Sequence, residues 1–416
     1  MNTLTTHMTP IYPRERYLSK VRPHIHKPLI KVLTGIRRSG KSALLTLIEE
    51  ELITQGVTRD HIIRINFEDI AAEPLTDRHL LDRYLRETMT GTQPYYLLLD
   101  EIQEVREWEK LVNSLLVKGN TDIYLTGSNS RLLSSELSTY LAGRYVEIPV
   151  QTLSFAEYLD FTQNITGTFP ENRQEAFLRY LRLGGFPLIH IAQYDETSAN
   201  IVVGAVYSSV VLRDVIQRHN IRSTDLLERL IRYLFDNVGR IFSAKNISDF
   251  LKGENRSFAS NTIYEYLGYL EEAFIIRKAP RYDLAGKRIL KTLEKYYISD
   301  ISLVNATLGY RETAVAGLLE NIIYLELLSR DYRVCIGKQG EREIDFIAEK
   351  PGEKLYIQVC RTLAGSPDTL IREVTPLLAI KDQFPKYIVT LEEPWGTNQD
   401  GVRLISIAEF LLRETW

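Results

Sequence analysis

The stretch that decides the fold is LIKVLTGIRRSGKSALLTLIEEELI, residues 29–53. It opens with a short apolar run typical of a buried strand, and it closes with apolar spacing typical of a helix. Between them, residues 35–42 read GIRRSGKS and fit the pattern G-x-x-x-x-G-K-S in full. The glycines allow a tight turn, so that several N–H groups converge at the helix N-terminus, where an anion is favoured. The stretch therefore predicts a phosphate-binding loop.

This motif assigns roles to individual residues. We expect Lys41 to reach the β- and γ-phosphates of ATP, and the Ser42 hydroxyl to hold Mg²⁺. The alternative is a glycine turn that happens to precede a lysine, but strand, loop and helix all fall where the chemistry needs them. ATP and Mg²⁺ are the predicted cofactors, and the predicted nucleotide-binding residues of the loop are Gly35, Arg38, Ser39, Gly40, Lys41, Ser42 and Ala43.

A second strand supplies two carboxylates. Residues 95–101 read YYLLLDE, an apolar run that ends in Asp100 and Glu101. At the tip of a strand, Asp100 can hold the magnesium through water, and Glu101 can act as general base on the attacking water. In isolation the pair would be an acidic surface turn. Downstream of a complete phosphate loop, the catalytic interpretation is preferred.

Composition limits the partners and the compartment. The net charge of -3 gives the whole chain no attraction to nucleic acid. Two cysteines, Cys335 and Cys360, are too few for a disulfide framework and fit a reducing cytoplasm. The longest uncharged apolar stretch, residues 199–212, is too short to span a bilayer, so we expect a buried helix and no membrane partner.

The order of apolar patterns predicts an α/β multidomain chain. Residues 1–153 alternate short strands with helices, which is typical of a parallel sheet, and residues 154–222 have helical spacing. Residues 223–310 read as three helices followed by two strands, the order of a winged helix. Residues 311–416 read as a separate α/β unit.

The whole chain resembles a broad family of bacterial and archaeal AAA+ ATPases. The resemblance is carried by GIRRSGKS, INFED (65–69), LLLDEIQ (97–103), LTGSNSRLL (125–133), AGRYVEI (142–148), LSFAEYL (153–159), GGFP (184–187), KYYISDISLVNA (295–306) and EIDF (343–346). It implies an AAA+ core, a helical lid, a winged helix and a C-terminal domain with a restriction-endonuclease-like fold.

Further site residues follow only from this resemblance. Asn129, in the position of a polar sensor, would read the γ-phosphate, although Ser-Asn after a strand is also a common helix cap. Arg144 stands where these ATPases carry an arginine finger for a neighbouring subunit, unless it is a plain surface arginine. Gly185 and Pro187 would line the adenine pocket, unless the GGFP loop is only a strained turn between helices.

The predicted wing is basic. Seven positive and two negative side chains lie between residues 277 and 295, a local charge of +5. The preceding helix, however, contains Glu265, Glu271 and Glu272, so base reading looks weak, and winged helices also serve as protein contacts. The residues predicted to contact DNA are Arg277, Lys278, Arg281, Lys287 and Arg288.

The last domain resembles nucleases of the PD-(D/E)xK type with a degenerate site. Glu320 and Asp345 occupy the first two acidic positions of that pattern. The third element reads Gln358-Val359-Cys360, which lacks both the second carboxylate and the lysine that steadies the attacking water. We therefore expect no nuclease activity.

These observations predict a cytoplasmic, homo-oligomeric ATPase that acts on a protein client or on DNA. Hydrolysis would use Glu101 of one subunit with Arg144 of its neighbour. The alternative is a switch that binds ATP, turns it over slowly and regulates a DNA or protein partner. Both share the same site residues, so the sequence does not separate them.

Overall fold

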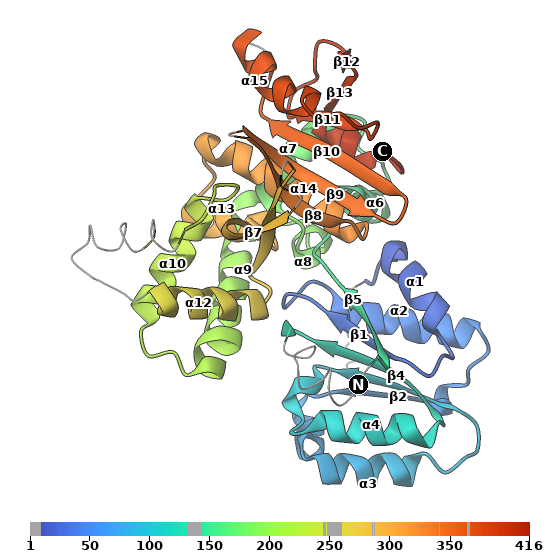
Figure 1. The fold of residues 1–416 in the computed structure, drawn as a ribbon. Helices are drawn as coiled ribbons and strands as arrows, with labels where there is room; N and C mark the ends of the chain where they lie inside the picture. The colour runs from blue at the N-terminus through green and yellow to red at the C-terminus, as the bar shows by residue number, and fades with distance from the viewer. Residues whose placement is uncertain are drawn as a thin grey trace. The chain divides into compact units, whose positions relative to one another are not determined.

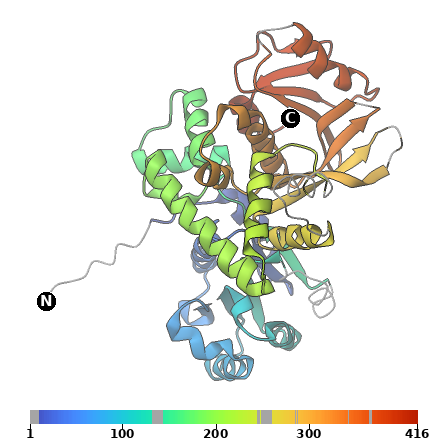
Figure 2. The same cartoon turned by 90° about the vertical axis from the view of Figure 1, so that its left-hand side faces the viewer.

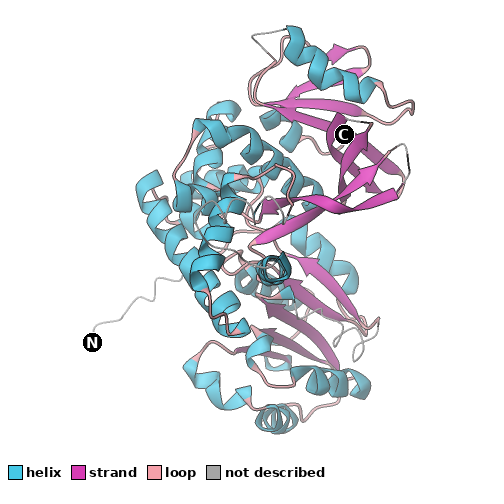
Figure 3. Ribbon diagram, turned by 60° about the vertical axis from the view of Figure 1, so that its left-hand side comes forward, coloured by secondary structure: helices cyan, strands magenta, loops and turns pink. Residues whose placement is uncertain are grey.

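The computed structural model describes residues 10–130, 143–243, 247, 260–284, 286, 288–340, 342–363 and 367–416 (Figure 1). The chain divides into two compact units. The N-terminal unit comprises residues 1–152 and 272–274, and the C-terminal unit comprises residues 153–271 and 275–416. Each unit has its own sheet, drawn in magenta in Figure 3.

The sheet of the N-terminal unit has five strands in the order β2-β3-β4-β1-β5, and every pairing is parallel. This arrangement confirms the predicted parallel sheet. β1 lies between β4 and β5, so the phosphate-binding loop that follows it begins inside the sheet. The strands are β1 (Ile30–Thr34), β2 (Ile62–Asn66), β3 (Tyr95–Asp100), β4 (Thr121–Gly127) and β5 (Tyr145–Pro149).

Helices cover both faces of this sheet (Figure 1). Successive strand residues point to opposite faces, so Leu98 joins one core and its neighbours Leu97 and Leu99 join the other. The helices α1 (Glu15–Val21) and α2 (Lys41–Thr54) pack on the Leu98 face, and α3 (Arg78–Thr88) and α4 (Trp108–Lys118) pack on the other. Short 3₁₀ turns complete the unit: η1 (Arg22–His24), η2 (Arg59–His61), η3 (Ile70–Thr76) and η4 (Ile102–Glu104).

An ion pair is buried in the Leu98 face. Lys31 of β1 donates to the carboxylate of Asp122 on β4, and both residues are almost fully buried. The Tyr124 hydroxyl and the His26 amide also donate to Asp122, at 3.0 and 2.9 Å. Burial lowers the pKa of Lys31, and the charge of Asp122 opposes that shift. The pair therefore joins two central strands at the cost of taking two charges out of water.

Asp122→Ala should lower the free energy of unfolding by about 3–5 kcal/mol, because it leaves the Lys31 ammonium buried without its partner. Urea unfolding of the full chain measures this loss. The double variant Lys31→Met/Asp122→Leu removes both charges and should recover most of the stability. A double variant as unstable as Asp122→Ala would show that the ion pair itself holds the strands.

The sheet of the C-terminal unit has eight strands in the order β12-β13-β11-β10-β9-β8-β6-β7. The β6–β7 hairpin, which the sequence placed in a separate wing, continues this sheet because β6 pairs in parallel with β8. The strands are β6 (Ile276–Asp283), β7 (Arg288–Ile298), β8 (Arg333–Gln339), β9 (Arg342–Lys350), β10 (Glu353–Cys360), β11 (Lys386–Thr390), β12 (Asn398–Gln399) and β13 (Val402–Ser406).

The helices of this unit fall into two groups. Those that pack against the sheet are α14 (Val315–Ser329), α15 (Pro367–Leu378) and α16 (Ile407–Leu412). The others are α6 (Phe155–Thr166), α7 (Arg173–Leu183), α8 (Pro187–Ile191), α9 (Glu196–Ser209) with its π-helical continuation η6 (Val210–Gln217), α10 (Thr224–Asp236), α12 (Ser260–Glu272), α13 (Ile301–Leu308) and the turn η7 (Glu312–Ala314). The middle helix expected in the winged helix, residues 247–253, lies almost wholly outside the described residues, so that motif stays a prediction.

One helix among the described residues is long and apolar enough to cross a membrane, judged by length and composition. It is the 22-residue helix Glu196–Gln217, formed by α9 and η6, and it includes the apolar stretch expected to be buried (Figure 2). One third of its most apolar window is buried, and α9 packs against α7 and α13. A single such helix is weak evidence for a membrane, because helices in protein cores meet the same criteria.

Candidate functional site

The phosphate-binding loop of the N-terminal unit has the conformation that its glycines predict. Gly35 has φ 148°, and a Cβ at this position would lie 2.1 Å from the carbonyl oxygen of Val150. Gly40 has φ 99° and precedes the first turn of α2, where the Leu44 amide donates to its carbonyl at 2.9 Å. The close approach of backbone at Gly35 and the left-handed conformation at Gly40 both favour glycine.

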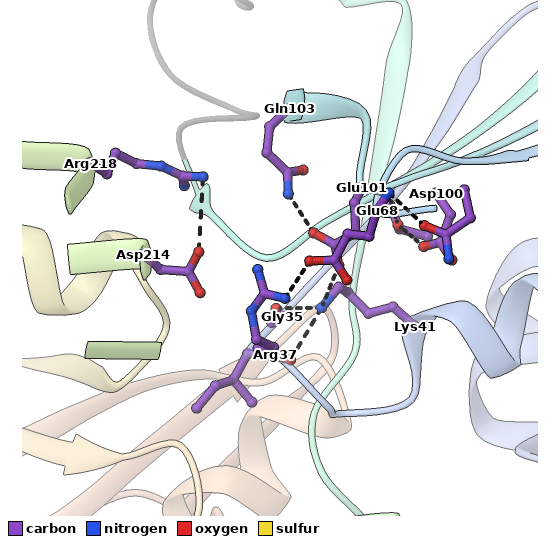
Figure 4. Close-up of polar contacts among 12 residues, drawn as sticks. Gly35, Arg37, Lys41, Glu68, Asp100, Glu101, Gln103, Asp214 and Arg218 are labelled. Carbon is purple, nitrogen blue, oxygen red and sulfur yellow. Dashed lines mark hydrogen bonds and ion pairs between the residues drawn. The ribbon is translucent and has the colours of Figure 1, made fainter. Parts of the chain in front are cut away.

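Lys41 points back over this loop (Figure 4). Its Nζ donates to the carbonyl oxygens of Gly35 and Ile36, at 3.0 and 3.2 Å. The same nitrogen lies 3.8 Å from Oε1 of Glu101, and the lysine is 4% exposed. The predicted phosphate ligand and the predicted general base therefore lie side by side in one buried site.

Asp100, the last residue of β3, is 1% exposed and lies close to two hydroxyl groups. Thr126 Oγ1 on β4 donates to its Oδ1, and the Ser42 hydroxyl of the phosphate-binding loop lies near the carboxylate. Burial raises the pKa of Asp100, and the two hydroxyl donors oppose that shift. The contact joins the two residues predicted to hold magnesium.

Glu101 follows in a left-handed backbone conformation, φ 55°, and is 6% exposed. Its amide donates to Thr126 Oγ1 at 2.8 Å, and Gln103 Nε2 donates to its Oε2. Burial alone would raise the pKa of Glu101, but the Lys41 charge, the Gln103 hydrogen bond and the Arg37 charge outweigh burial and lower it. The carboxylate is therefore ionised at neutral pH, as a general base must be.

The residues present fit a magnesium ion. Ser42 and Asp100 offer oxygen ligands that already lie in contact. Mg²⁺ is commonly bound by one or two protein oxygens together with substrate phosphates and water rather than by a cage of side chains. In keeping with that mode, no group of three or more His, Cys, Asp or Glu side chains in the described part of the chain is arranged to hold a metal ion.

The structure adds residues that the sequence analysis missed. Arg37 Nη1 lies 2.6 Å from Oε1 of Glu68, which comes shortly after β2. Glu68 belongs to the INFED segment, which is one of the segments that carry the family resemblance. Arg37 occupies one of the four variable positions of the phosphate-binding motif, so the motif assigns it no role. Thr126 and Gln103 lie in quoted segments as well, yet nothing in the sequence pairs them with the two carboxylates.

Asn129 and Arg144 lie in different parts of the unit. Asn129 is buried shortly after β4 and follows Ser128, which is also buried. Arg144 directly precedes β5, which runs parallel to β1. It is exposed, with Nη1 3.4 Å from Asn113 Oδ1, and it lies beside the start of β1, whereas the phosphate-binding loop follows the end of that strand. Arg144 is therefore not part of the site of its own subunit.

The GGFP loop belongs to the C-terminal unit. Gly185 donates its amide to Asp300 Oδ2 at 2.9 Å and accepts from the Leu153 amide at 2.7 Å. Gly184 has φ 68°, and a Cβ there would lie 2.1 Å from Asp300 Oδ1. Pro187 is the first residue of α8. The left-handed φ and the close approach of Asp300 explain the glycine at position 184, and the predicted contact of Gly185 and Pro187 with adenine stays a prediction.

The basic hairpin offers less free charge than its composition suggested. Lys278 Nζ lies 2.7 Å from Glu294, and Arg281 is buried. Arg288 is exposed but lies opposite Asp283 in the β6–β7 ladder, and Arg277 is half-buried. Lys287 lies outside the described residues. Contact with DNA through these residues stays a prediction, and of the described cations Lys278 is paired within the hairpin and Arg281 is buried.

Three of the residues predicted for a degenerate nuclease-like site, Glu320, Asp345 and Gln358, lie close together. Asp345 accepts from the Val359 amide at 2.8 Å, and its own amide donates to Gln358 Oε1 at 3.3 Å. Lys295 bridges Glu320 and Asp345, because its Nζ is 3.0 Å from Glu320 and 3.7 Å from Asp345. In the sequence, Lys295 is one of the seven positive side chains of the predicted wing. The structure corrects that reading by placing it among carboxylates.

Cys360 belongs to a hydrophobic core instead. It packs in the cluster that contains Ile344, Tyr356 and Leu377. Burial raises the pKa of its thiol to about 12. Both cysteines are buried and neither forms a disulfide.

Thr126→Val should lower ATP turnover roughly tenfold, because it removes the hydroxyl that donates to Asp100 and accepts from the Glu101 amide. Steady-state phosphate release measures the change. Thr126→Ser keeps the hydroxyl and is the matched control, with turnover close to the unaltered chain. Equal turnover in the valine and serine variants would contradict the role given to this hydroxyl.

Comparison with known proteins agrees with this geometry. Residues 27–159 match an AAA domain, and residues 174–314 match a domain of unknown function. An uncharacterized protein of Haemophilus influenzae is 39% identical over 96% of this chain and 98% of its own length. An uncharacterized protein of Methanocaldococcus jannaschii is 31% identical over 80% of this chain and 75% of its own length. Among solved structures, a Walker-type ATPase of Pyrococcus abyssi is similar, with a TM-score of 0.50 and 18% identity, over 72% of this chain and 96% of that one.

Proposed function

This chain belongs to the AAA-domain family that includes its Haemophilus influenzae and Methanocaldococcus jannaschii relatives, and we propose on that basis that it is a Mg²⁺-dependent ATP hydrolase. One observation carries the proposal. The phosphate-binding loop, the hydroxyl–carboxylate contact of Ser42 with Asp100, and an ionised Glu101 meet in one buried site. A site that only bound phosphate would need the first of these features and not the last.

Each residue has a task in hydrolysis. The loop amides and the Lys41 ammonium bind the β- and γ-phosphates, whose negative charge replaces the carbonyl oxygens that Lys41 now contacts. Ser42 and Asp100 would hold the magnesium, which neutralises phosphate charge when bound. Glu101 orients the attacking water and takes its proton, and Gln103 and Lys41 fix the direction of its carboxylate.

The low pKa of Glu101 favours hydrolysis over a purely regulatory nucleotide switch. A carboxylate that is buried yet ionised costs free energy, and three neighbouring groups stabilise it here. Phosphate binding alone does not require that arrangement. The work done by hydrolysis would be applied to a client. We propose a protein ahead of DNA, because Lys278 and Lys295 of the β6–β7 hairpin are paired with carboxylates and Arg281 is buried.

Glu101→Gln should lower turnover by about 10²–10⁴-fold while ATP still binds, because the amide cannot accept the proton of water. Lys41→Ala should lose both binding and turnover. Calorimetric titration with ATP and Mg²⁺ measures binding, and phosphate release measures turnover. Turnover in Glu101→Gln equal to that of the unaltered chain would refute the assignment of the base, whereas a Lys41→Ala variant with unchanged binding would refute the nucleotide site itself.

We further propose that Arg144 completes the site of a neighbouring subunit. Its exposed position beside the start of β1 leaves it available to a second copy of the chain and keeps it away from the phosphate-binding loop at the end of that strand. Turnover per subunit should therefore rise with protein concentration, since the complete site forms only on association. Arginine fingers of this kind raise turnover by about 10³–10⁵-fold.

A mixing experiment tests this arrangement. Arg144→Ala and Glu101→Gln should each be inactive, for different reasons, because the first lacks the finger and the second lacks the base. Mixed, they should regain part of the turnover, since Arg144→Ala subunits keep Glu101 and receive Arg144 from their neighbours. Arg83→Ala, a change at another exposed arginine of the unit, is the control and should remain active. A mixture no more active than its components would exclude a shared site.

A further inference from the structure

A buried ammonium lies among three carboxylates in the C-terminal unit. Lys295 of β7 is 2% exposed, and its Nζ lies 2.7 Å from Glu343 Oε1, 3.0 Å from Glu320 Oε2 and 3.7 Å from Asp345 Oδ1. Glu320 comes from α14, whereas Glu343 and Asp345 come from β9. Three secondary-structure elements thus direct charged groups at one point.

Other groups hold the carboxylates in place. The Tyr297 hydroxyl donates to Glu320 Oε2 at 3.1 Å, and the Val359 amide donates to Asp345 Oδ2 at 2.8 Å. Glu343 is the member nearest to solvent, with 28% of its side chain exposed, and its Oε2 has no hydrogen-bond partner among the described residues. We call Lys295, Glu320, Glu343 and Asp345 the lysine–carboxylate cluster.

The cluster carries more negative than positive charge. With all four groups ionised, one ammonium faces three carboxylates. Burial and then the charge of Asp345 raise the pKa of Glu320 to about 8, and burial also raises the pKa of Asp345, to about 6. Burial would lower the pKa of Lys295, but the surrounding carboxylates outweigh it and raise this pKa. The lysine therefore stays protonated, and the cluster depends on its charge.

A divalent metal, which a nuclease-like fold implies at this place, does not fit the residues present. The point where the carboxylates converge is filled by the Lys295 ammonium. Gln358, which contacts the Asp345 amide, supplies a neutral group where the nuclease pattern has a carboxylate.

We propose that Lys295 is the built-in cation of this cluster, so that the chain takes no divalent metal there, and that removing the ammonium opens a divalent-cation site made of Glu320, Glu343 and Asp345. A route for the ion exists, because Glu343 and Gln358 line a cavity of about 480 Å³ together with Arg342, Arg372 and Glu373. Lys295→Met keeps the length of the aliphatic stem and deletes only the charge. The three carboxylates can then close on a metal ion in its place.

Mn²⁺ binding to the full chain tests the proposal. All variants carry Asp100→Asn and are measured without nucleotide, so that the nucleotide site contributes no metal ligand from Asp100. Electron paramagnetic resonance should detect no tightly bound Mn²⁺ with Lys295 in place and one bound Mn²⁺ per chain in Lys295→Met. The matched control is Lys354→Met, which removes a lysine of the same sheet that is paired with Glu349 at 2.7 Å, and it should bind none.

Stability gives a second measurement. Without added metal, Lys295→Met should lower the melting temperature by roughly 10 °C, because the ionised carboxylates of the cluster lose their only counter-charge. Mn²⁺ should restore at least half of that loss in Lys295→Met and none of any loss in Lys354→Met. The double variant Lys295→Met/Glu320→Gln removes one basic and one acidic group, so it should fold without Mn²⁺. It should bind Mn²⁺ at least roughly tenfold more weakly than Lys295→Met does, because it has one charged ligand fewer.

Three results would overturn the proposal. The first is tight Mn²⁺ binding to the chain with Lys295 in place that Glu343→Gln abolishes, because the ammonium would then not exclude the metal. The second is a Lys295→Met chain that stays unfolded when it is refolded with Mn²⁺. The third is a folded Lys295→Met chain that binds no more Mn²⁺ than Lys354→Met does.

Discussion

Two carboxylates, those of Asp100 and Glu101, lie side by side inside the N-terminal unit, and the nucleotide site depends on how their charge is stabilised. A buried carboxylate is costly unless hydrogen bonds and opposite charges surround it. Asp100 is stabilised by hydroxyl donors and Glu101 by Lys41, Gln103 and Arg37, so burial prevails at Asp100 and the surrounding charges prevail at Glu101. Thr126 links the two, because one hydroxyl donates to the first carboxylate and accepts from the amide of the second residue. The pKa of Asp100, the proposed metal ligand, is thus raised, whereas the pKa of Glu101, the proposed base, is lowered.

Much of this site could be predicted from the sequence, because its parts are local. The strand before Gly35, the helix after Gly40 and the carboxylates at the end of β3 follow from apolar patterns and from a motif with fixed spacing. The partners that arrive from other elements could not be predicted. Arg37 meets Glu68 only because β2 and β1 belong to one sheet, and Thr126 meets Asp100 only because β3 and β4 are paired. Such contacts depend on strand order, which no local pattern records.

The C-terminal unit shows the same limit more strongly. Its strands and helices are recognisable one by one, yet the hairpin that reads as a separate wing is part of a larger sheet. Lys295 illustrates the consequence: in the sequence it is one of several cations in a basic segment, and in the fold it is enclosed by acids from α14 and β9. Charge counted along the chain therefore overestimated the positive surface of this segment.

The parallel pairing of β6 with β8 also affects how the chain can be assembled and divided. These strands are joined through β7, α13 and α14, so β6 finds its second neighbour only after that intervening stretch has been made. Pairings of such high sequence separation form slowly. A fragment that ended between α13 and β8 would leave one side of β6 as a bare row of amides and carbonyls, open to pairing with other molecules. The region from the hairpin to the C-terminus is better regarded as one cooperative folding unit than as two modules in series.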